Sequence, residues 1–205
     1  MIFNIFQSYV YNEKDPFFYL PYFMKEIFQP LSGVIEIIAY FLIGLGILKS
    51  GVKQSFAAFM LWGMLDIIAT ITTIIEQGNY WLALSNAVGA TAVCILLGLK
   101  KQISWTWVEL FTATLVVVCL GVWIITGEIF GLISSSIAVV IAAVPQMVET
   151  YKKPASTPTR AYVVFLIANV VSLFAGRSWS IEERFYPACG VFLTVVILVF
   201  SLRKI

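Results

Sequence analysis

Seven apolar stretches, each about as long as a membrane helix, dominate this chain of 205 residues. A helix needs about 20 mostly apolar residues to cross roughly 30 Å of hydrocarbon. Charged residues make up only 12% of the chain, so most of its surface must face something other than water. The sequence predicts an all-α integral membrane protein with seven transmembrane helices. They are expected at 31–49, 56–75, 81–99, 105–126, 129–150, 161–177 and 185–202.

The first 30 residues differ from the rest of the chain. Pro16, Pro21 and Pro30 are expected to interrupt any long helix, because proline lacks the backbone N–H that a helix needs. Aromatic residues gather at 17–23, and aromatic side chains favour the membrane–water interface. We therefore expect residues 1–30 to lie on the membrane surface. They lack the pattern of a cleavable signal peptide.

Lysine and arginine are distributed unevenly between the two sides of the predicted membrane. Cytoplasmic loops retain positive charge during insertion. Nine of the 13 cations share one side: Lys49, Lys53, Lys100, Lys101, Lys152, Lys153, Arg160, Arg203 and Lys204. This predicts a multi-pass protein of an inner or plasma membrane, with its N-terminus outside and its C-terminus in the cytoplasm. Such termini need an odd number of spans, in agreement with seven.

The first three spans resemble the last three. A shift of 103 residues aligns them without a gap, so that Lys49 falls on Lys152 and Asp66 on Asn169. A unit of three spans reverses the chain direction, and one linker span then makes the two units parallel. The sequence predicts a 3+1+3 parallel repeat of triple-helix bundles, with substrate bound between them near the midplane. The predicted divisions are 1–30, 31–99, 100–127 as the linker, and 128–205.

Asp66 is the most costly residue to place in a membrane. It lies about 15 Å along the second span, at 1.5 Å per residue. A central Asp costs roughly 2.5–3.5 kcal/mol, so it should face protein or water rather than lipid. We expect it to contact substrate or to couple transport to a proton. The alternative is an Asp held by Thr70 or by another helix for packing specificity.

Three further side chains are candidates for binding substrate. The 103-residue shift places Asn169 as deep in the sixth span as Asp66 lies in the second. The two side chains are therefore expected to approach one polar solute from opposite sides. Trp62 precedes Asp66 by four residues and shares its helical face, where an indole can stack on a substrate ring. Asn86 lies in the outer half of the third span, where it either binds substrate or cross-links helices. Glu36 lies nearer the end of its span, so we expect water at the interface to solvate it.

Composition argues against several functions. The chain has no histidine, which disfavours zinc hydrolases, His-ligated haem and His-based catalytic triads. A net charge of +2 does not suit a nucleic-acid partner. Cys94, Cys119 and Cys189 fall in apolar runs and are expected to be small buried hydrophobes rather than a disulfide framework or metal site. No phosphate-binding Gly-Lys loop occurs. We expect no enzyme activity, no cofactor and no metal.

A motif stands at the cytoplasmic end of the fifth span. Pro145–Gln146 is followed by the basic pair Lys152–Lys153 and by a Ser/Thr segment at 155–158. A proline here either acts as a hinge or makes a structural kink that fits packing, and Gln146 offers an amide to the freed backbone or to a neighbouring helix.

This pattern resembles the PQ-loop superfamily, which includes the SWEET and SemiSWEET sugar facilitators and the lysosomal cystine and cationic amino-acid exporters. The resemblance covers nearly everything after residue 30 and identifies the chain as a divergent, bacterial-type relative. It implies a carrier that works by alternating access and favours Pro145 as a hinge.

The chain departs from the family pattern at two places. The repeat places Leu42 and Ile43 opposite Pro145 and Gln146, so the first unit lacks the motif. Sugar facilitators carry a substrate-binding asparagine near the position of Asn86. The repeat mate of Asn86 is Cys189, so a symmetric asparagine pair is absent.

These features favour a small secondary carrier of a polar metabolite, either a sugar or an amino acid, with proton coupling through Asp66. Its expected partners are a small-molecule substrate and the lipid bilayer, and an oligomer is compatible with the sequence. One alternative is a seven-helix receptor that binds its ligand in a polar cavity without transport, although a carboxylate ligand would need a buried cation. Another is a facilitator of a nucleoside-like vitamin precursor. A retinal photoreceptor is disfavoured because the last span contains no lysine.

Overall fold

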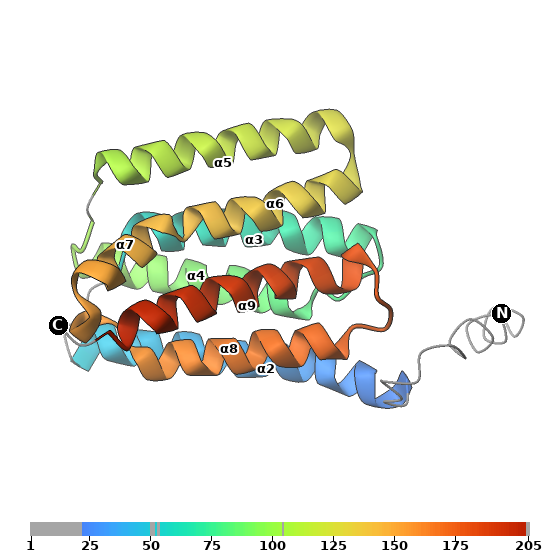
Figure 1. The fold of residues 1–205 in the computed structure, drawn as a ribbon, viewed down its shortest axis with the longest axis horizontal. Coiled ribbons are helices and arrows are strands. Elements are labelled where there is room, and N and C mark those ends of the chain that lie inside the picture. Colours follow the sequence, from blue (N-terminus) through green and yellow to red (C-terminus); the bar gives the residue numbers. More distant parts are fainter. Residues whose placement is uncertain (1–21, 50–51, 53, 104, 204–205) are drawn as a thin grey trace, which may run out of the picture.

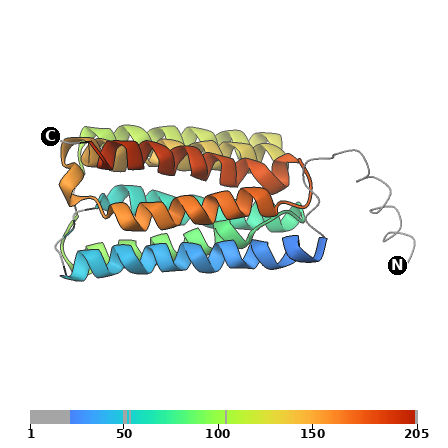
Figure 2. The same cartoon turned by 60° about the horizontal axis from the view of Figure 1, so that its bottom comes forward.

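The computed structural model describes residues 22–49, 52, 54–103 and 105–203, and every regular element among them is helical. The helices run along the long axis of the molecule (Figures 1 and 2). They are α2 (Tyr22–Lys49), α3 (Phe56–Ile75), α4 (Trp81–Leu99), α5 (Trp107–Thr126), α6 (Glu128–Ala142), α7 (Val144–Lys152), the short η1 (Pro154–Ser156), α8 (Thr159–Ala175) and α9 (Ile181–Ser201).

Six helical segments of the described chain are long and apolar enough to cross a membrane: α2, α3, α4, α5, the joined pair α6–α7, and α9. The seventh, α8, is apolar but has 17 residues. At 1.5 Å per residue that is roughly 26 Å, near the lower limit for a span. Large apolar side chains such as Ile124 and Leu110 point outward. The protein is therefore a multi-pass helical membrane protein whose outer faces suit a lipid bilayer.

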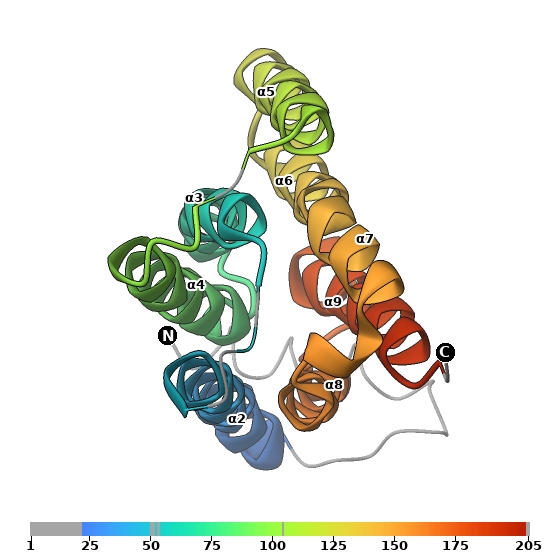
Figure 3. The same ribbon diagram turned by 90° about the vertical axis from the view of Figure 1, so that its left-hand side faces the viewer.

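The helices form two groups of three, with α5 outside both (Figure 3). In one group α4 lies between α2 and α3, and in the other α9 lies between α8 and the α6–α7 pair. The groups meet where α2 packs on α8 and where α3 packs on α6. Helix α5 packs mainly on α6. This arrangement leaves the inner faces of six segments directed at one central region.

Glycines on α3 and α4 allow the first group to pack closely. A Cβ atom at Gly63 would lie 2.9 Å from the hydroxyl of Thr91. One at Gly89 would lie 2.1 Å from the ring of Tyr40. Small residues at helix interfaces let backbones and rings approach in this way. Gly89 therefore provides the space in which the Tyr40 ring lies against α4.

The predicted break at Pro30 is wrong. Helix α2 begins at Tyr22 and continues through Pro30. Proline removes one backbone hydrogen bond, here the one that would go to the carbonyl of Glu26 in the preceding turn, and helices in membranes tolerate that loss. Residues 1–21, with Pro16, Pro21 and most of the predicted surface segment, lie outside the described residues.

Proline has a larger effect in the fifth span. The helix is interrupted at Ala143, two residues before Pro145, and α7 starts directly afterwards. Backbone bonds from Ala143 N to Val139 O (3.2 Å) and from Met147 N to Ala143 O (2.8 Å) connect the two pieces. The span is therefore one bent rod in which Pro145 occupies the first turn after the bend.

Charge separates the two ends of the molecule. Helices α2, α4 and α7 end, and α3 and α8 begin, at one end, which we call the basic end (Figure 1). The other end, called here the opposite end, holds the α3–α4 and α8–α9 loops. The described cations at the basic end are Lys49, Lys100, Lys101, Lys152, Lys153, Arg160 and Arg203. The uneven charge predicted from sequence thus corresponds to the two ends of a real helical bundle.

Candidate functional site

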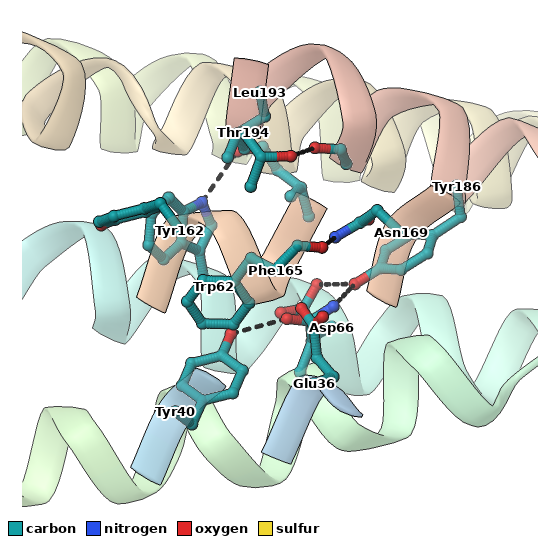
Figure 4. Close-up of a pocket in the computed structure, with 13 residues that line it drawn as sticks. Glu36, Tyr40, Trp62, Asp66, Tyr162, Phe165, Asn169, Tyr186, Leu193 and Thr194 are labelled. Carbon is teal, nitrogen blue, oxygen red and sulfur yellow. Dashed lines mark hydrogen bonds between the residues drawn. The ribbon is translucent and has the colours of Figure 1, made fainter. Parts of the chain in front are cut away.

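A polar cavity lies between the two helix groups, about halfway along the spans (Figure 4). Its volume is about 50 Å³. That is room for about four water molecules. The four predicted substrate-binding residues Trp62, Asp66, Asn86 and Asn169 all line it. The structure thus brings together side chains from α3, α4 and α8 that are far apart in the sequence.

A chain of three hydrogen bonds runs along the wall of this cavity. The Tyr40 hydroxyl donates to Asn86 Oδ1 at 2.7 Å, and Asn86 Nδ2 donates to the Tyr186 hydroxyl at 3.1 Å. The Tyr186 hydroxyl in turn donates to Asp66 Oδ1 at 2.7 Å. The network joins α2, α4, α9 and α3. Asn86 therefore cross-links helices, one of its two predicted roles, and also lines the cavity.

Asp66 is buried, with 1% of its surface exposed. The Thr70 hydroxyl donates to the backbone carbonyl of Asp66 at 2.6 Å rather than to its carboxylate. The side-chain partner is Tyr186, 120 residues further along the chain. A tyrosine within an apolar span looks like a lipid or core residue in the sequence, so no local signal could have identified this partner.

The structure corrects the site predicted from sequence most clearly at Glu36. We expected solvation at the interface, yet Glu36 is 1% exposed and lines the cavity. Because α2 starts at Tyr22 rather than after Pro30, Glu36 lies near the middle of its helix. Its Oε2 atom is buried without a hydrogen-bond partner among the described residues. Figure 4 shows its carboxyl group beside that of Asp66.

Aromatic rings form the rest of the wall. The Tyr40 and Phe165 rings pack edge to face with centroids 4.8 Å apart, and Tyr162 lies against Phe165 at 5.7 Å. The Trp62 indole N–H donates to the carbonyl of Val139 at 3.0 Å, which holds the ring against α6. These side chains present ring surface close to the two carboxyl groups.

Asn169 is held from two sides. Its Nδ2 atom donates to the carbonyl of Phe165 in the preceding turn of α8, at 2.8 Å. Its Oδ1 atom lies against α9, where a Cβ atom at Gly190 would approach to 1.7 Å. Only glycine at position 190 leaves room for the Asn169 amide. The close contact between α8 and α9 therefore sets the position of Asn169 in the cavity.

Gln146 lies outside the cavity, in what we call the basic-end cluster. Its side chain is completely buried. The backbone N–H of Ser55, the residue that caps α3, donates to Gln146 Oε1 at 3.0 Å, and Gln146 Nε2 donates to the Thr150 hydroxyl at 3.2 Å. Thr150 is also bonded to the hydroxyl of Thr157. The predicted hinge pair thus connects α7 to the first helix group.

Tyr162 connects the cavity with the basic end. Its ring lines the cavity, and its hydroxyl donates to Gln54 Oε1 at 3.0 Å. Gln54 lies just before α3, next to Ser55. Two hydrogen bonds, Ser55–Gln146 and Tyr162–Gln54, therefore join the helix groups between the cavity and the basic end.

A second cluster, the opposite-end cluster, was not predicted. Glu183 is 4% exposed and accepts from Gln29 Nε2 at 3.1 Å, from Arg177 Nε at 2.8 Å and from the Arg177 backbone N–H at 3.1 Å. Arg177 also donates to the carbonyl of Gln77 in the α3–α4 loop. The cluster joins α2, α3 and α9 around one ion pair.

Arg184 supports the same end. Its guanidinium donates to the carbonyl oxygens of Ser178 (2.7 Å), Gly176 (2.9 Å) and Leu173, which follow or end α8. It also lies over the Trp179 ring at 3.9 Å. Cations near a helix C-terminus satisfy its free carbonyl groups. Burial of Arg184 is therefore explained by a structural role at the end of α8.

The remaining predictions on chemistry concern metals and thiols. Within the described part of the chain, no group of three or more His, Cys, Asp or Glu side chains could hold a metal ion. Cys94 and Cys189 are half-buried free thiols. The side chain of Cys119 lies outside the described set.

Comparisons of the chain with protein-family models, with curated proteins and with solved structures return no match.

Proposed function

We propose that this protein is a secondary carrier that moves a small polar solute across the membrane by alternating access. The observation that carries the proposal is a buried polar cavity between two helix groups, with a separate set of hydrogen bonds joining the groups toward each end. A carrier needs a central site that opens to one side at a time. Separate sets of bonds toward the two ends allow one end to part while the other stays joined.

The helix contacts support the proposed 3+1+3 repeat. The 103-residue shift moves Lys49, the end of α2, onto Lys152, the end of α7, and Phe56, the start of α3, onto Thr159, the start of α8. The same shift converts the packing of α4 on α2 and α3 into that of α9 on α6 and α8. It also exchanges the α2–α8 interface with the α3–α6 interface. A pseudo-two-fold axis between parallel bundles accounts for all six contacts, with α5 as the linker.

The bend at Ala143 supports a hinge of the PQ-loop type. A proline frees a carbonyl in the turn before it and weakens the helix locally. Bending there moves α7 relative to α6 and separates Gln146 from Ser55. The cavity then opens at the basic end, which charge assigns to the cytoplasm. The N-terminus lies outside in this orientation.

Proton coupling through Asp66 is part of the proposal. The titratable groups that face Asp66 in the cavity are Glu36 and Tyr40 on α2, Tyr162 on α8 and Tyr186 on α9. The described cavity residues of α4 and α6 contribute no titratable group. If Asp66 exchanges the coupled proton, Asp66→Asn transports without dependence on an imposed pH gradient. A variant whose uptake responds to the gradient like the parent would remove Asp66 from coupling.

Access to the cavity from both sides tests the carrier proposal without knowledge of the substrate. Thr194 lines the cavity, and its neighbour Val195 points outward from α9. In a background with the three native cysteines replaced by alanine, we expect Thr194→Cys in proteoliposomes to react with a membrane-impermeant thiol reagent added to either side. Val195→Cys, facing lipid, is the matched control and should react from neither. Reaction of Thr194→Cys from one side alone would instead support the receptor alternative.

A further inference from the structure

The cavity has an unbalanced charge. Glu36 and Asp66 both line it and are each 1% exposed. Among the described residues that line the cavity there is no lysine or arginine. A buried carboxyl group in a membrane protein needs either a proton or a cation beside it. The site therefore offers two places for positive charge and no protein group that supplies it.

Glu36 has an acceptor that the protein leaves unused. Its Oε2 atom is buried and has no hydrogen-bond partner in the described structure, whereas Asp66 Oδ1 accepts from Tyr186. A buried acceptor without a partner costs about 1–3 kcal/mol. Figure 4 shows the Glu36 carboxyl group directed into the cavity beside Asp66. An incoming donor would satisfy this atom.

Ring faces and edges surround the carboxyl groups. Tyr40, Trp62 and Phe165 line the same cavity. Aromatic faces attract ammonium groups by about 0.5–2 kcal/mol, more when the pair is removed from water. The combination of carboxylate and aromatic wall suits a positive charge carried on a small hydrocarbon.

We infer that this cavity binds a compact organic ammonium ion without a carboxylate group, with its nitrogen between Glu36 and Asp66 and its carbon atoms against the aromatic wall. The binding site itself does not depend on the proposed carrier function. Only the further statement that this ion is the transported solute rests on that function. The N–H groups donate to Glu36 Oε2 and to the free lone pairs of Asp66. Ethanolamine, a small ammonium ion without a carboxylate, is the probe for this class.

The same features disfavour the substrates expected from sequence. A free amino acid brings a carboxylate that would face Glu36 and Asp66 with no cation beside it in the described wall. A sugar brings no charge to offset the two carboxyl groups. An ammonium ion matches the charge of the site.

Thermal unfolding of the purified full chain in detergent tests this inference. We expect ethanolamine to raise the unfolding temperature, because a ligand that binds only the folded state stabilises it. Ethylene glycol has the same number of non-hydrogen atoms and no charge, and should have no effect at equal concentration. Sodium chloride at matched ionic strength is the second control. An equal response to ethylene glycol or to sodium chloride, or no response to ethanolamine, would overturn the inference.

Variants locate the binding. Glu36→Gln should weaken ethanolamine binding about tenfold or more, since a hydrogen bond to a charged group contributes about 1.5–3 kcal/mol. Glu76→Gln is the matched control, because Glu76 lies at the end of α3 away from the cavity. Unchanged affinity in Glu36→Gln would overturn the placement. If that variant does not fold, the comparison of ethanolamine with ethylene glycol on the parent chain still decides.

Uptake of labelled ethanolamine into proteoliposomes separates the two proposals. Binding without uptake, together with thiol access from one side, would refute the carrier function and leave the ammonium site in place. Access from both sides without any effect of ethanolamine would refute the ammonium site and leave a carrier of another solute.

Discussion

The two helix groups are joined by different chemistry toward the two ends of the cavity. At the basic end the bonds between them are neutral, from Ser55 to Gln146 and from Tyr162 to Gln54. At the opposite end bonds between them involve a charged group, from Gln29 to Glu183 at 3.1 Å and from Arg177 to the Gln77 carbonyl. Hydrogen bonds with one ionised partner are roughly twice as strong as neutral ones. For the proposed carrier, this difference favours opening at the basic end over opening at the opposite end.

The ends also differ in how they are joined to the fold. The basic-end cluster lies on α7, beyond the bend at Ala143, so it can move with a short rigid segment. The opposite-end cluster joins side chains of two long helices and the α8–α9 loop to a backbone carbonyl of the α3–α4 loop, so opening it requires a movement of whole helices. Both comparisons give the same order of opening, and the following variants test it through the reactivity of Thr194→Cys.

Glu183→Ala should have the largest effect. It leaves Arg177 and Gln29 without their shared acceptor and should destabilise the closed opposite end by about 2–3 kcal/mol. We expect faster reaction of Thr194→Cys with a thiol reagent applied at the opposite end, and a lower unfolding temperature. The control is Glu182→Ala, the same substitution one residue earlier on a more exposed side chain. Equal effects of the two variants would refute a role of Glu183 in joining the helix groups at the opposite end.

Gln146→Ala should open the basic end. It removes the acceptor for the Ser55 N–H and the donor to Thr150, which we expect to cost the closed state about 1–2 kcal/mol. Reaction of Thr194→Cys from the basic side should become faster, with no change from the opposite side. Glu149→Ala on the same helix is the control, since its contact with Lys153 is an exposed ion pair at 3.7 Å. Faster reaction from the opposite side would contradict the assignment.

Tyr162→Phe should have the smallest effect. It removes only the hydroxyl bond to Gln54, about 1 kcal/mol, and keeps the ring in the cavity wall. Reactivity from the basic side should rise a few-fold, less than in Gln146→Ala. Tyr151→Phe, on the half-exposed ring near the end of α7, should leave reactivity unchanged. A larger change in Tyr162→Phe than in Gln146→Ala would make Tyr162, rather than the motif, the main closure.

Helix positions were largely predictable. Helices α3 and α4 begin and end at the residues expected from apolar length alone, because the thickness of the membrane sets that length. The expected break at Pro30 was wrong, because a single proline costs the helix only one backbone bond and α2 continues through it. That error carried over to Glu36, whose depth was counted from a start that is too late. A small local misassignment thus concealed one of the two carboxyl groups of the site.

Part of the site was predictable for a similar reason. Asp66 and Asn169 are polar within apolar spans, so their cost in lipid marks them in the sequence. The sequence does not single out Tyr186 and Tyr40 in this way, because a tyrosine in an apolar run fits a lipid-facing, core or interfacial position equally well. Their hydroxyl groups become site residues only when α9 and α2 bring them to Asp66 and Asn86.

The sequence by itself determined the helical membrane class, the approximate spans and the uneven charge of the two ends. These properties depend on the transfer of side chains between water and lipid, which each segment experiences independently. Only the tertiary structure decided which carboxyl groups share a cavity, which tyrosines bind them and how each end is closed. Those contacts join residues up to 154 positions apart, as between Gln29 and Glu183, and they exist only after the helices pack.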